Sequence, residues 1–414
     1  MKEEIRIHLN DPGHLEKLYR TNKVHFKRSF LALYPELKGN SLADFWNARL
    51  NYESDQINWG TNRELVVVLI ACLLAGLIAK LPALLSIDED FFYPRNIGFI
   101  IFPALAAYFA WKNKLSRSKI AFIVGTTFLS LLFINFLPDV NKSDTLLLSC
   151  VHLLLFLWSI LGFAFVGEIR NKDEKRLSYL KYNGDLIVMT TLMFIAGGIM
   201  TGLTIGLFSL IGFQIEEFYF ENVVLFGLPA APIFGTYLTQ TNPQLVGRVS
   251  PVIARIFSPL VLVMLLIYLV AIDYSGKDPY NDREFLLIFN GLLIGVMAII
   301  FFSVAETANS TKHGIELWVI FLLSVVTILV NGIALSAILF RITEWGITPN
   351  RAAVLGGNVL ILINLILVTV QLFRVLLKKV DLSAVGKAIA FYLPIYCLWT
   401  MIVTFLFPLL FGFK

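Results

Sequence analysis

Eleven apolar runs follow a polar N-terminal segment, and they set the predicted architecture. The runs lie near 65–87, 97–111, 120–137, 146–166, 186–213, 223–238, 252–272, 285–304, 315–340, 352–377 and 385–412. A helix needs about 20 apolar residues to cross a hydrocarbon layer about 30 Å thick. Because the runs lack the alternation of barrel strands, each is expected to be a helix that satisfies its own backbone hydrogen bonds. The pattern predicts an all-α polytopic transmembrane helical bundle of about eleven spans.

The first 60 residues have a different pattern, in which apolar positions recur at roughly helical spacing among charged residues. These positions are Leu15, Leu18, Tyr19, Val24, Phe26, Phe30 and Leu33. A turn is expected at 35–40, and Ser41 is expected to cap a second helix over 42–50. Residues 1–60 are therefore predicted to form a small soluble helical module, and residues 61–414 the transmembrane helical domain.

The composition agrees with a membrane protein. Of the 414 residues, 57% are hydrophobic and 15% are charged, and the mean hydropathy is +0.75. Soluble domains carry about 25% charged residues. The three cysteines lie far apart inside apolar runs, which indicates neither a disulfide framework nor a zinc site. The chain also lacks a phosphate-binding loop and the H-E-x-x-H and G-x-S-x-G motifs, so no cofactor, metal or catalytic residue is predicted.

The net charge of +5 follows membrane topology, and no nucleic-acid partner is expected. With the N-terminus inside, the inner connections hold sixteen Lys and Arg residues, and the outer connections hold six, including Arg95. Acidic clusters at 88–90 and 216–221 then lie outside. The positive-inside rule therefore predicts a cytoplasmic N-terminus and, with an odd number of spans, a periplasmic C-terminus.

Three stretches are distinctive: LEKLYRTNKVHFKRSFLALYPELKGNSLADFWNARLNY, ARIFSPLVLVMLLIYLVAIDY and RITEWGITPNRAAVLGGNVL. Together they resemble an uncharacterised family of bacterial multi-pass membrane proteins that carry a domain of unknown function, and its Bacteroidetes-type members look most alike. The resemblance covers nearly the whole chain, and GITPNR is its most specific part. It implies a bacterial inner-membrane location and no known activity, and no functional residue is carried over from it.

Two ionisable residues are predicted at membrane depth, where a charge costs about 2.5–3.5 kcal/mol. Lys80 lies in the first run and His152 in the fourth. Lys80 is expected either to extend outward toward Asp88 or to belong to a buried site. His152 is expected to be a neutral histidine bonded to a neighbouring helix. If it shares a cavity with Lys80, the two residues are expected to handle protons or anions.

Neutral amides gather in the last four runs. Asn331, Asn358 and Asn364 are the candidates for an intramembrane polar site, and Asn290 and Gln371 accompany them. Amides of this kind commonly join helices through hydrogen bonds. The alternative interpretation is a hydrated pathway through the eighth to tenth runs.

Two backbone features also occur inside the runs. Gly198, Gly202 and Gly206 recur every four residues in the fifth run, so one helix face is bare backbone. This face is expected to pack against a neighbouring helix, to form a homodimer seam, or to be a sliding surface. Pro229 and Pro232 are expected to kink or break the sixth run, as in the interrupted helices of transporters.

The segment RITEWGITPNR, after the ninth run, is predicted to be a sharply turned helical hairpin on the outer side. Gly346 is expected to end one helix in a left-handed conformation. Thr348 is expected to cap the next helix, with Pro349 at its first position.

Three charged residues of this hairpin form a candidate outer-facing site: Arg341, Glu344 and Arg351. Arg341 and Glu344 are three residues apart, so they are expected to pair on the last helical turn. Arg351 lies in a first helical turn, where the helix dipole disfavours a cation. It is therefore predicted to have a carboxylate or an anionic ligand group as its partner.

Two functions fit these features. The first is a transporter, permease-like or flippase-like protein of unknown substrate, although no internal repeat pairs the two halves. The second is a membrane-embedded sensor or assembly scaffold whose module binds a cytoplasmic protein. The residues for that contact would be Lys23, His25, Phe26, Lys27, Arg28 and Phe30. The same basic and aromatic residues also suit an anionic membrane surface.

Overall fold

The computed structural model describes the chain in two compact units, Met1–Trp59 and Gly60–Lys414. It leaves residues 1, 22, 53–59, 141–142, 168–171, 211–212, 247–248, 276–282, 308–313 and 414 undescribed. The described residues form helices and turns and contain no strand, which confirms the all-α prediction. The division between the units lies one residue from the predicted boundary.

The first unit consists of four short helices. They are α1 (Lys2–Ile7), α2 (Pro12–Thr21), α3 (Lys23–Leu37) and α4 (Ser41–Tyr52). Their core is aromatic, with the rings of Tyr19, Phe26 and Phe30 around buried Trp46. Asn40 rather than Ser41 caps α4, because its Oδ1 accepts the backbone N–H groups of Leu42 and Ala43 at 3.0 and 3.1 Å.

The residues predicted to contact a cytoplasmic partner are only partly described in this unit. Phe26 and Phe30 are fully buried, so they are unavailable to the predicted partner contact. The side chains of Lys23, His25 and Arg28 lie outside the described residues.

On the surface of this unit, Glu16 accepts a hydrogen bond from Arg20 at 2.8 Å and pairs with Arg49 of α4 at 3.1 Å. The hydrogen bond from Arg20 is the main cause that lowers the pKa of Glu16, and the charge of Arg49 adds to it.

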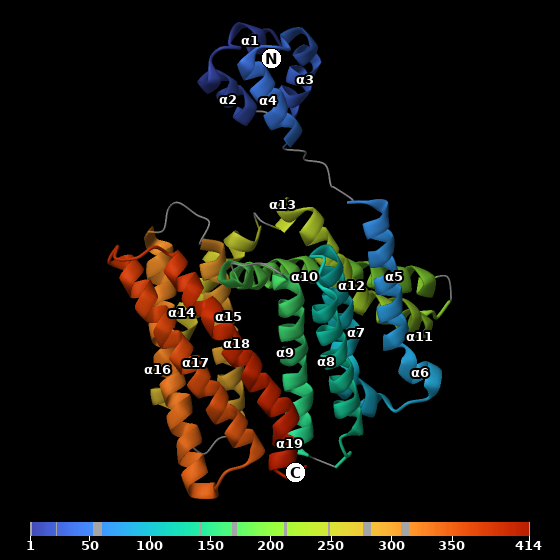
Figure 1. Cartoon of the computed structure of the whole chain (residues 1–414), viewed down its shortest axis with the longest axis vertical. Helices are drawn as coiled ribbons and strands as arrows, with labels where there is room; N and C mark the ends of the chain where they lie inside the picture. Colours follow the sequence, from blue (N-terminus) through green and yellow to red (C-terminus); the bar gives the residue numbers. More distant parts are fainter. Residues whose placement is uncertain are drawn as a thin grey trace. The chain divides into compact units, whose positions relative to one another are not determined.

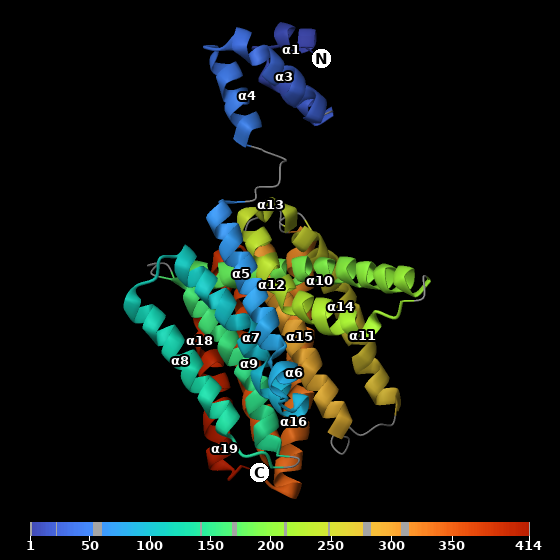
Figure 2. The same ribbon diagram turned by 90° about the vertical axis from the view of Figure 1, so that its right-hand side faces the viewer.

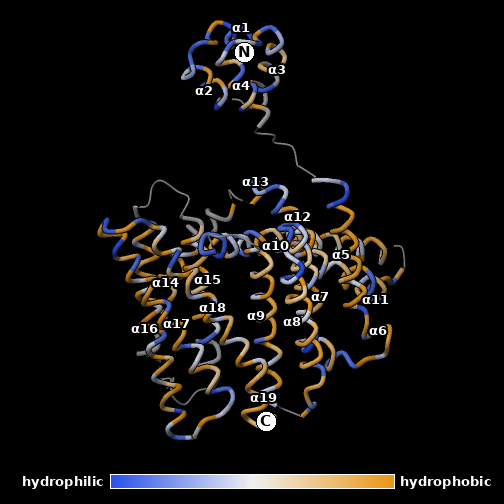
Figure 3. Tube along the Cα trace, in the orientation of Figure 1, coloured by the Kyte–Doolittle hydropathy of each residue, from blue (hydrophilic) through white to orange (hydrophobic). Residues whose placement is uncertain are grey.

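Every predicted apolar run of the second unit falls on a helix. The elements are α5 (Asn62–Ala79), α6 (Leu81–Leu85), α7 (Glu89–Lys112), α8 (Arg117–Phe136), α9 (Asp144–Val166), α10 (Lys172–Leu210), α11 (Glu216–Tyr219), η1 (Phe220–Val224), α12 (Leu225–Thr241), α13 (Pro243–Val246), α14 (Val249–Ser275), α15 (Arg283–Thr307), α16 (Gly314–Trp345), α17 (Pro349–Leu376), α18 (Ser383–Met401), η2 (Ile402–Leu406) and α19 (Phe407–Leu410). Figure 3 shows that these helices are apolar over most of their length.

Among the described residues, eight helices are long and apolar enough to cross a membrane. They include α5, α8, α9, α10, α16 and α17, together with the continuous segments Glu216–Thr241 and Ser383–Leu410. Shorter apolar stretches lie in α14 and α15, at Ile256–Ile267 and Asn290–Ala305. By length and composition these helices are compatible with a multi-pass membrane protein, whereas the predicted count of about eleven spans stays a prediction.

The second unit has two large hydrophobic cores and a small third cluster around Ala353, Val403 and Phe407. The first is built mainly from α5, α7, α8, α9 and α12, and the second from α14 to α18. Most of these helices run side by side in one general direction, whereas α10 runs across them (Figures 1 and 2). The predicted fifth span, 186–213, therefore belongs to a helix that is not aligned with the rest of the bundle.

Two π-helical turns interrupt the α-helices, and neither lies at the predicted prolines Pro229 and Pro232. α12 continues through Pro229 and Pro232 as one helix, and the departure from regular geometry is the preceding π-helical turn, Phe220–Val224. A second π-helical turn, Ile402–Leu406, links α18 to α19 and packs against α9. There the Ser149 hydroxyl donates to the Thr404 carbonyl at 2.8 Å, so this turn joins the two cores.

Candidate functional site

Buried amides form the main polar cluster of the second core. The Asn358 amide of α17 donates to Asn290 Oδ1 of α15 at 2.8 Å. Asn331 of α16 donates to the Asn358 carbonyl at 3.2 Å. Asn331 is 0% exposed and Asn358 is 3% exposed, whereas Asn290 is half-buried, so α16 and α17 contribute buried polar groups to this three-helix contact. The structure thus brings together two of the three predicted amides with a third from α15.

Asn364 anchors a second cluster on α17. Its amide donates to Tyr396 Oη of α18 at 3.0 Å, and that hydroxyl lies 3.3 Å from Met297 Sδ of α15. Asn364 is fully buried. Further along α17, Thr369 Oγ1 donates to Ser324 Oγ of α16 at 3.0 Å. Polar contacts therefore recur along the interface of α16 and α17, and α15 and α18 flank it. We call this set of contacts the amide line; its residues are Asn290, Asn331, Asn358, Asn364, Tyr396, Thr369 and Ser324.

Within the part of the chain that the structure describes, two oxygens of the amide line are buried without a hydrogen-bond donor: Asn331 Oδ1 and Asn364 Oδ1. The Asn358 carbonyl can only accept, which fixes the NH₂ group of Asn331 toward it and leaves Oδ1 as the unpaired atom. A buried polar group without a partner costs about 1–3 kcal/mol. Each oxygen can accept a hydrogen bond from water or from a polar solute, or coordinate a cation.

Lys80 lies at a helix end, not inside a span. α5 ends at Ala79, and Lys80 precedes the proline-containing turn α6. The lysine Nζ donates to Asn222 Oδ1 in the turn before α12, not to Asp88. This part-buried contact joins the end of α5 to the turn before α12, which favours a structural role for this lysine.

His152 is bonded within its own helix. Its Nδ1 lies 2.9 Å from the Leu148 carbonyl, one turn earlier in α9. Because a carbonyl only accepts, Nδ1 carries the proton in this contact. Among the described contacts, none joins His152 to Lys80, so the predicted shared cavity gains no support from the structure.

The hairpin between α16 and α17 has the predicted local geometry. Gly346 has φ +76°, Thr348 Oγ1 accepts the Arg351 N–H at 3.4 Å, and Pro349 opens α17. These capping predictions are confirmed. The left-handed φ of Gly346 suits glycine, since other L residues adopt it at a cost.

Arg351, one of the three charged residues of the hairpin, has different partners from those predicted. The Arg351 guanidinium donates to the backbone carbonyls of Trp345 and Gly346 at 2.9 and 2.6 Å. It therefore caps the C-terminus of α16, where a cation is favoured by the helix dipole. Arg341 is 8% exposed, and its guanidinium lies 5.7 Å from the centre of the Trp345 ring. The pairing of Arg341 with Glu344 stays a prediction.

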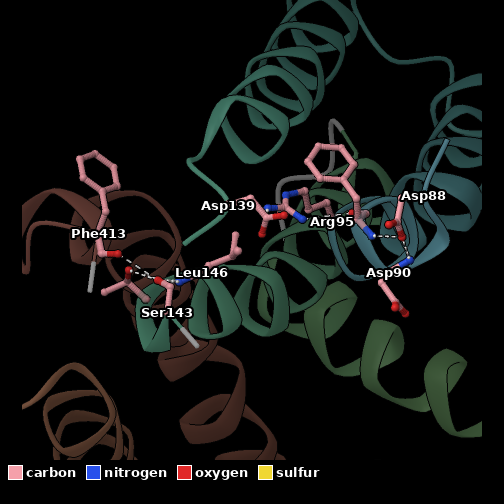
Figure 4. A network of polar contacts seen from close by, with 9 residues as sticks. Asp88, Asp90, Arg95, Asp139, Ser143, Leu146 and Phe413 are labelled. Carbon is pink, nitrogen blue, oxygen red and sulfur yellow. Dashed lines mark hydrogen bonds and ion pairs between the residues drawn. The ribbon is translucent and has the colours of Figure 1, made fainter. Parts of the chain in front are cut away.

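A buried arginine that the charge count placed in an outer connection belongs to α7 instead. Arg95 is 3% exposed and pairs with Asp139, whose side chain is 69% exposed, at 3.2 Å. Figure 4 shows this pair beside Asp88, which caps α7 through the N–H of Asp90 at 2.7 Å. Arg95 Nε is buried without a hydrogen-bond partner. The ion pair ties α7 to the connection between α8 and α9.

A reciprocal amide pair adjoins Arg95 in the sequence. Asn96 donates to Asn135 Oδ1 at 2.9 Å, and Asn135 donates back to Asn96 Oδ1 at 2.8 Å. Sequence reasoning missed this contact. The available signal was the adjacent polar pair at 95–96 and a lone asparagine at the end of the third apolar run.

The glycine face of α10 packs against no other described part of the chain. A Cβ atom built on Gly198, Gly202 or Gly206 would meet nothing within 4 Å. The prediction that these glycines receive a neighbouring helix of the same chain is therefore wrong for the described residues. Close helix contacts occur at other glycines, such as Gly76 against Phe226 and Gly184 against Phe302.

Comparison with known proteins identifies no relative. The chain matches no family model, no curated protein and no solved structure.

Proposed function

We propose that this chain is a transporter, permease-like or flippase-like, of a bacterial inner membrane, and that a polar solute passes along the amide line. The observation that carries the proposal is the unpaired Asn331 Oδ1, buried in the middle of α16. An apolar side chain would remove the cost of an unpaired oxygen. The retention of the amide is therefore explained best by a ligand or water that binds it during function.

The arrangement of the helices supports the same proposal. Two separate hydrophobic cores meet where α18 and its π-helical turn pack on α9. Two packed bundles can move against each other as rigid bodies, which is how many transporters expose a site to alternate sides. The amide line lies within the second bundle, so motion of α16 or α17 would open it.

Cysteine accessibility tests the proposal without knowledge of the substrate. In a background in which Cys72, Cys150 and Cys397 are replaced by Ala, single cysteines are introduced at the three amide positions. The variants are Asn331→Cys, Asn358→Cys and Asn364→Cys. A membrane-impermeant methanethiosulfonate reagent is applied to membrane vesicles of each orientation. A pathway predicts that at least one of the three cysteines is labelled from the aqueous phase.

Matched controls occupy neighbouring positions. Val330 and Leu365 are fully buried and adjacent in sequence to Asn331 and Asn364. Val330→Cys and Leu365→Cys should stay unlabelled under the same conditions. Absence of labelling at all three amide positions from both sides would refute the pathway, and equal labelling at the controls would show general loosening of the fold.

A sensor or assembly scaffold is the second candidate function. This function is favoured because Met1–Trp59 forms a compact unit of its own, with its own aromatic core. A cytoplasmic protein would then bind this unit. Deletion of residues 1–59 should abolish a scaffold's function, whereas a transporter's labelling pattern along the amide line should persist.

We also propose the orientation, with residues 1–60 in the cytoplasm and the C-terminus in the periplasm. The excess of Lys and Arg in the inner connections, sixteen to six, supports it. Alkaline phosphatase fused after Lys414 should be active, and the same enzyme fused after Lys114 should be inactive. The opposite pattern would reverse the orientation.

In this proposal the protein is surrounded by the lipid bilayer. The exposed apolar side chains of α5, α8 and α10 would contact the lipids. The uncovered faces of α10 also suit a second copy of the chain, as in a homo-oligomer. We further propose membership of the uncharacterised bacterial family that the three distinctive stretches resemble.

A further inference from the structure

Three metal-ligating side chains converge at the turn between α1 and α2. They are His8, Asp11 and His14, spaced three residues apart. Their ligand atoms all lie within 4.8 Å of one another. In a tetrahedral zinc site with bonds of about 2.0–2.1 Å, ligand atoms lie about 3.3 Å apart. Closing this site on an ion therefore needs side-chain shifts of about 1.5 Å or less.

Local backbone bonds hold the three residues in place. The Asp11 N–H donates to the His8 carbonyl at 3.0 Å, which closes the turn after α1. Asp11 then caps α2, because its Oδ1 accepts the His14 N–H at 3.0 Å. The carboxylate is thereby fixed beside His14 with its second oxygen available to an ion. A site whose backbone is already ordered loses less entropy on binding.

The two imidazole rings are also oriented together. Their centroids lie 3.8 Å apart, and the ring planes are inclined by 23°. Both rings are half-buried, and Asp11 is exposed, so an ion can reach the site from solvent.

We propose that His8, Asp11 and His14 bind a divalent transition-metal ion, with Zn²⁺ as the preferred species. Two imidazoles and one carboxylate are the ligands of catalytic and regulatory zinc sites, which leave a fourth position to water. Mg²⁺ and Ca²⁺ select sets of oxygen ligands and do not fit two imidazoles. The site is independent of the amide line, because it lies in the other compact unit.

Binding would fasten α1 to α2. With six residues, α1 is too short to be stable as an isolated helix. It is held by Ile5, which is buried in the aromatic core, and by Arg6, which pairs with Glu36 of α3, and a bridging ion would add a further attachment at its C-terminal end. The ion would thus order the first helix of the unit that a cytoplasmic partner would meet.

The test uses the full chain purified in detergent without a histidine tag. Zinc bound per chain is measured by elemental analysis after dialysis, and affinity by competition with a chromophoric chelator. Wild type should bind one zinc ion at this site. Loss of a residue that only hydrogen-bonds to a metal ligand weakens metal binding by about 10–100-fold. His8→Ala and His14→Ala each remove a ligand itself, so each should weaken zinc binding by at least that factor.

Two further variants make the result specific. Asp11→Asn keeps the helix cap but removes the charge, so it should weaken zinc binding while α2 stays formed. His152→Asn, in the other unit, should leave zinc binding unchanged. Absence of zinc in wild type, or unchanged affinity in His8→Ala and His14→Ala, would overturn the proposal. Neither result would alter the cysteine-labelling test of the amide line.

Discussion

A pair of neighbouring glycines in α17 offers a direct test of how tightly α17 and α18 pack beside the amide line. A Cβ atom on Gly356 would lie within 3.0 Å of three atoms of the Trp399 indole. A Cβ atom on Gly357 would meet only Trp399 Nε1, at 3.9 Å, which is ordinary contact. The indole itself packs edge-on against Phe407, with ring centres 6.0 Å apart, so its movement is restricted.

The expected free energies follow from two opposing terms. Replacing glycine by alanine inside a helix favours the helix by about 1 kcal/mol. Overpacking a close contact costs about 1–3 kcal/mol. Gly357→Ala should therefore stabilise the protein by up to about 1 kcal/mol, and Gly356→Ala should destabilise it by up to about 2 kcal/mol. The helix term is common to both variants, so their difference isolates the cost of the contact with Trp399.

The measurement is the free energy of unfolding of each variant in mixed micelles, by steric trapping or by titration with a denaturing detergent. A destabilisation of Gly356→Ala relative to Gly357→Ala of about 1–3 kcal/mol would agree with the packing. Equal effects of the two substitutions would show that α17 and α18 do not approach closely at this point, and would refute the reasoning.

Three further predictions concern polar contacts. Lys80→Met should change stability by less than about 0.5 kcal/mol, because the contact between Lys80 and Asn222 is only part-buried; a loss roughly four times larger would contradict this. Arg351→Gln should cost about 1 kcal/mol, more than Thr348→Ala, because two charge-assisted bonds outweigh one long cap; the reverse order in thermal unfolding would show that the cap dominates. The lowered pKa of Glu16 means that its bond from Arg20 stabilises the first unit above the ordinary Glu pKa and ceases to do so as pH falls through the lowered value. Rate-corrected hydrogen exchange of α2 should therefore accelerate in acid, and Glu16→Gln should remove that pH dependence.

The sequence by itself determined the helices and their local ends. Long apolar runs without alternation permit only helices in a hydrocarbon layer, and most described residues of each run are helical in the structure. The cap by Thr348 and the left-handed Gly346 were also predictable, because caps depend on residues within about one turn of each other. The histidine and aspartate at 8, 11 and 14 were equally local. Their spacing, H-x-x-D-x-x-H, differs from both C-x-x-C and H-E-x-x-H.

Only the tertiary structure decided which polar groups meet. Lys80 and its partner Asn222 are 142 residues apart, and Asn358 and Asn290 are 68 residues apart. The direction of α10, which leaves its glycines uncovered, was likewise invisible in its composition. In a lipid environment the exterior of a helix is as apolar as its buried side, so periodicity does not tell which face is packed. The polar contacts are then set by how whole helices fit together, a property that no single segment contains.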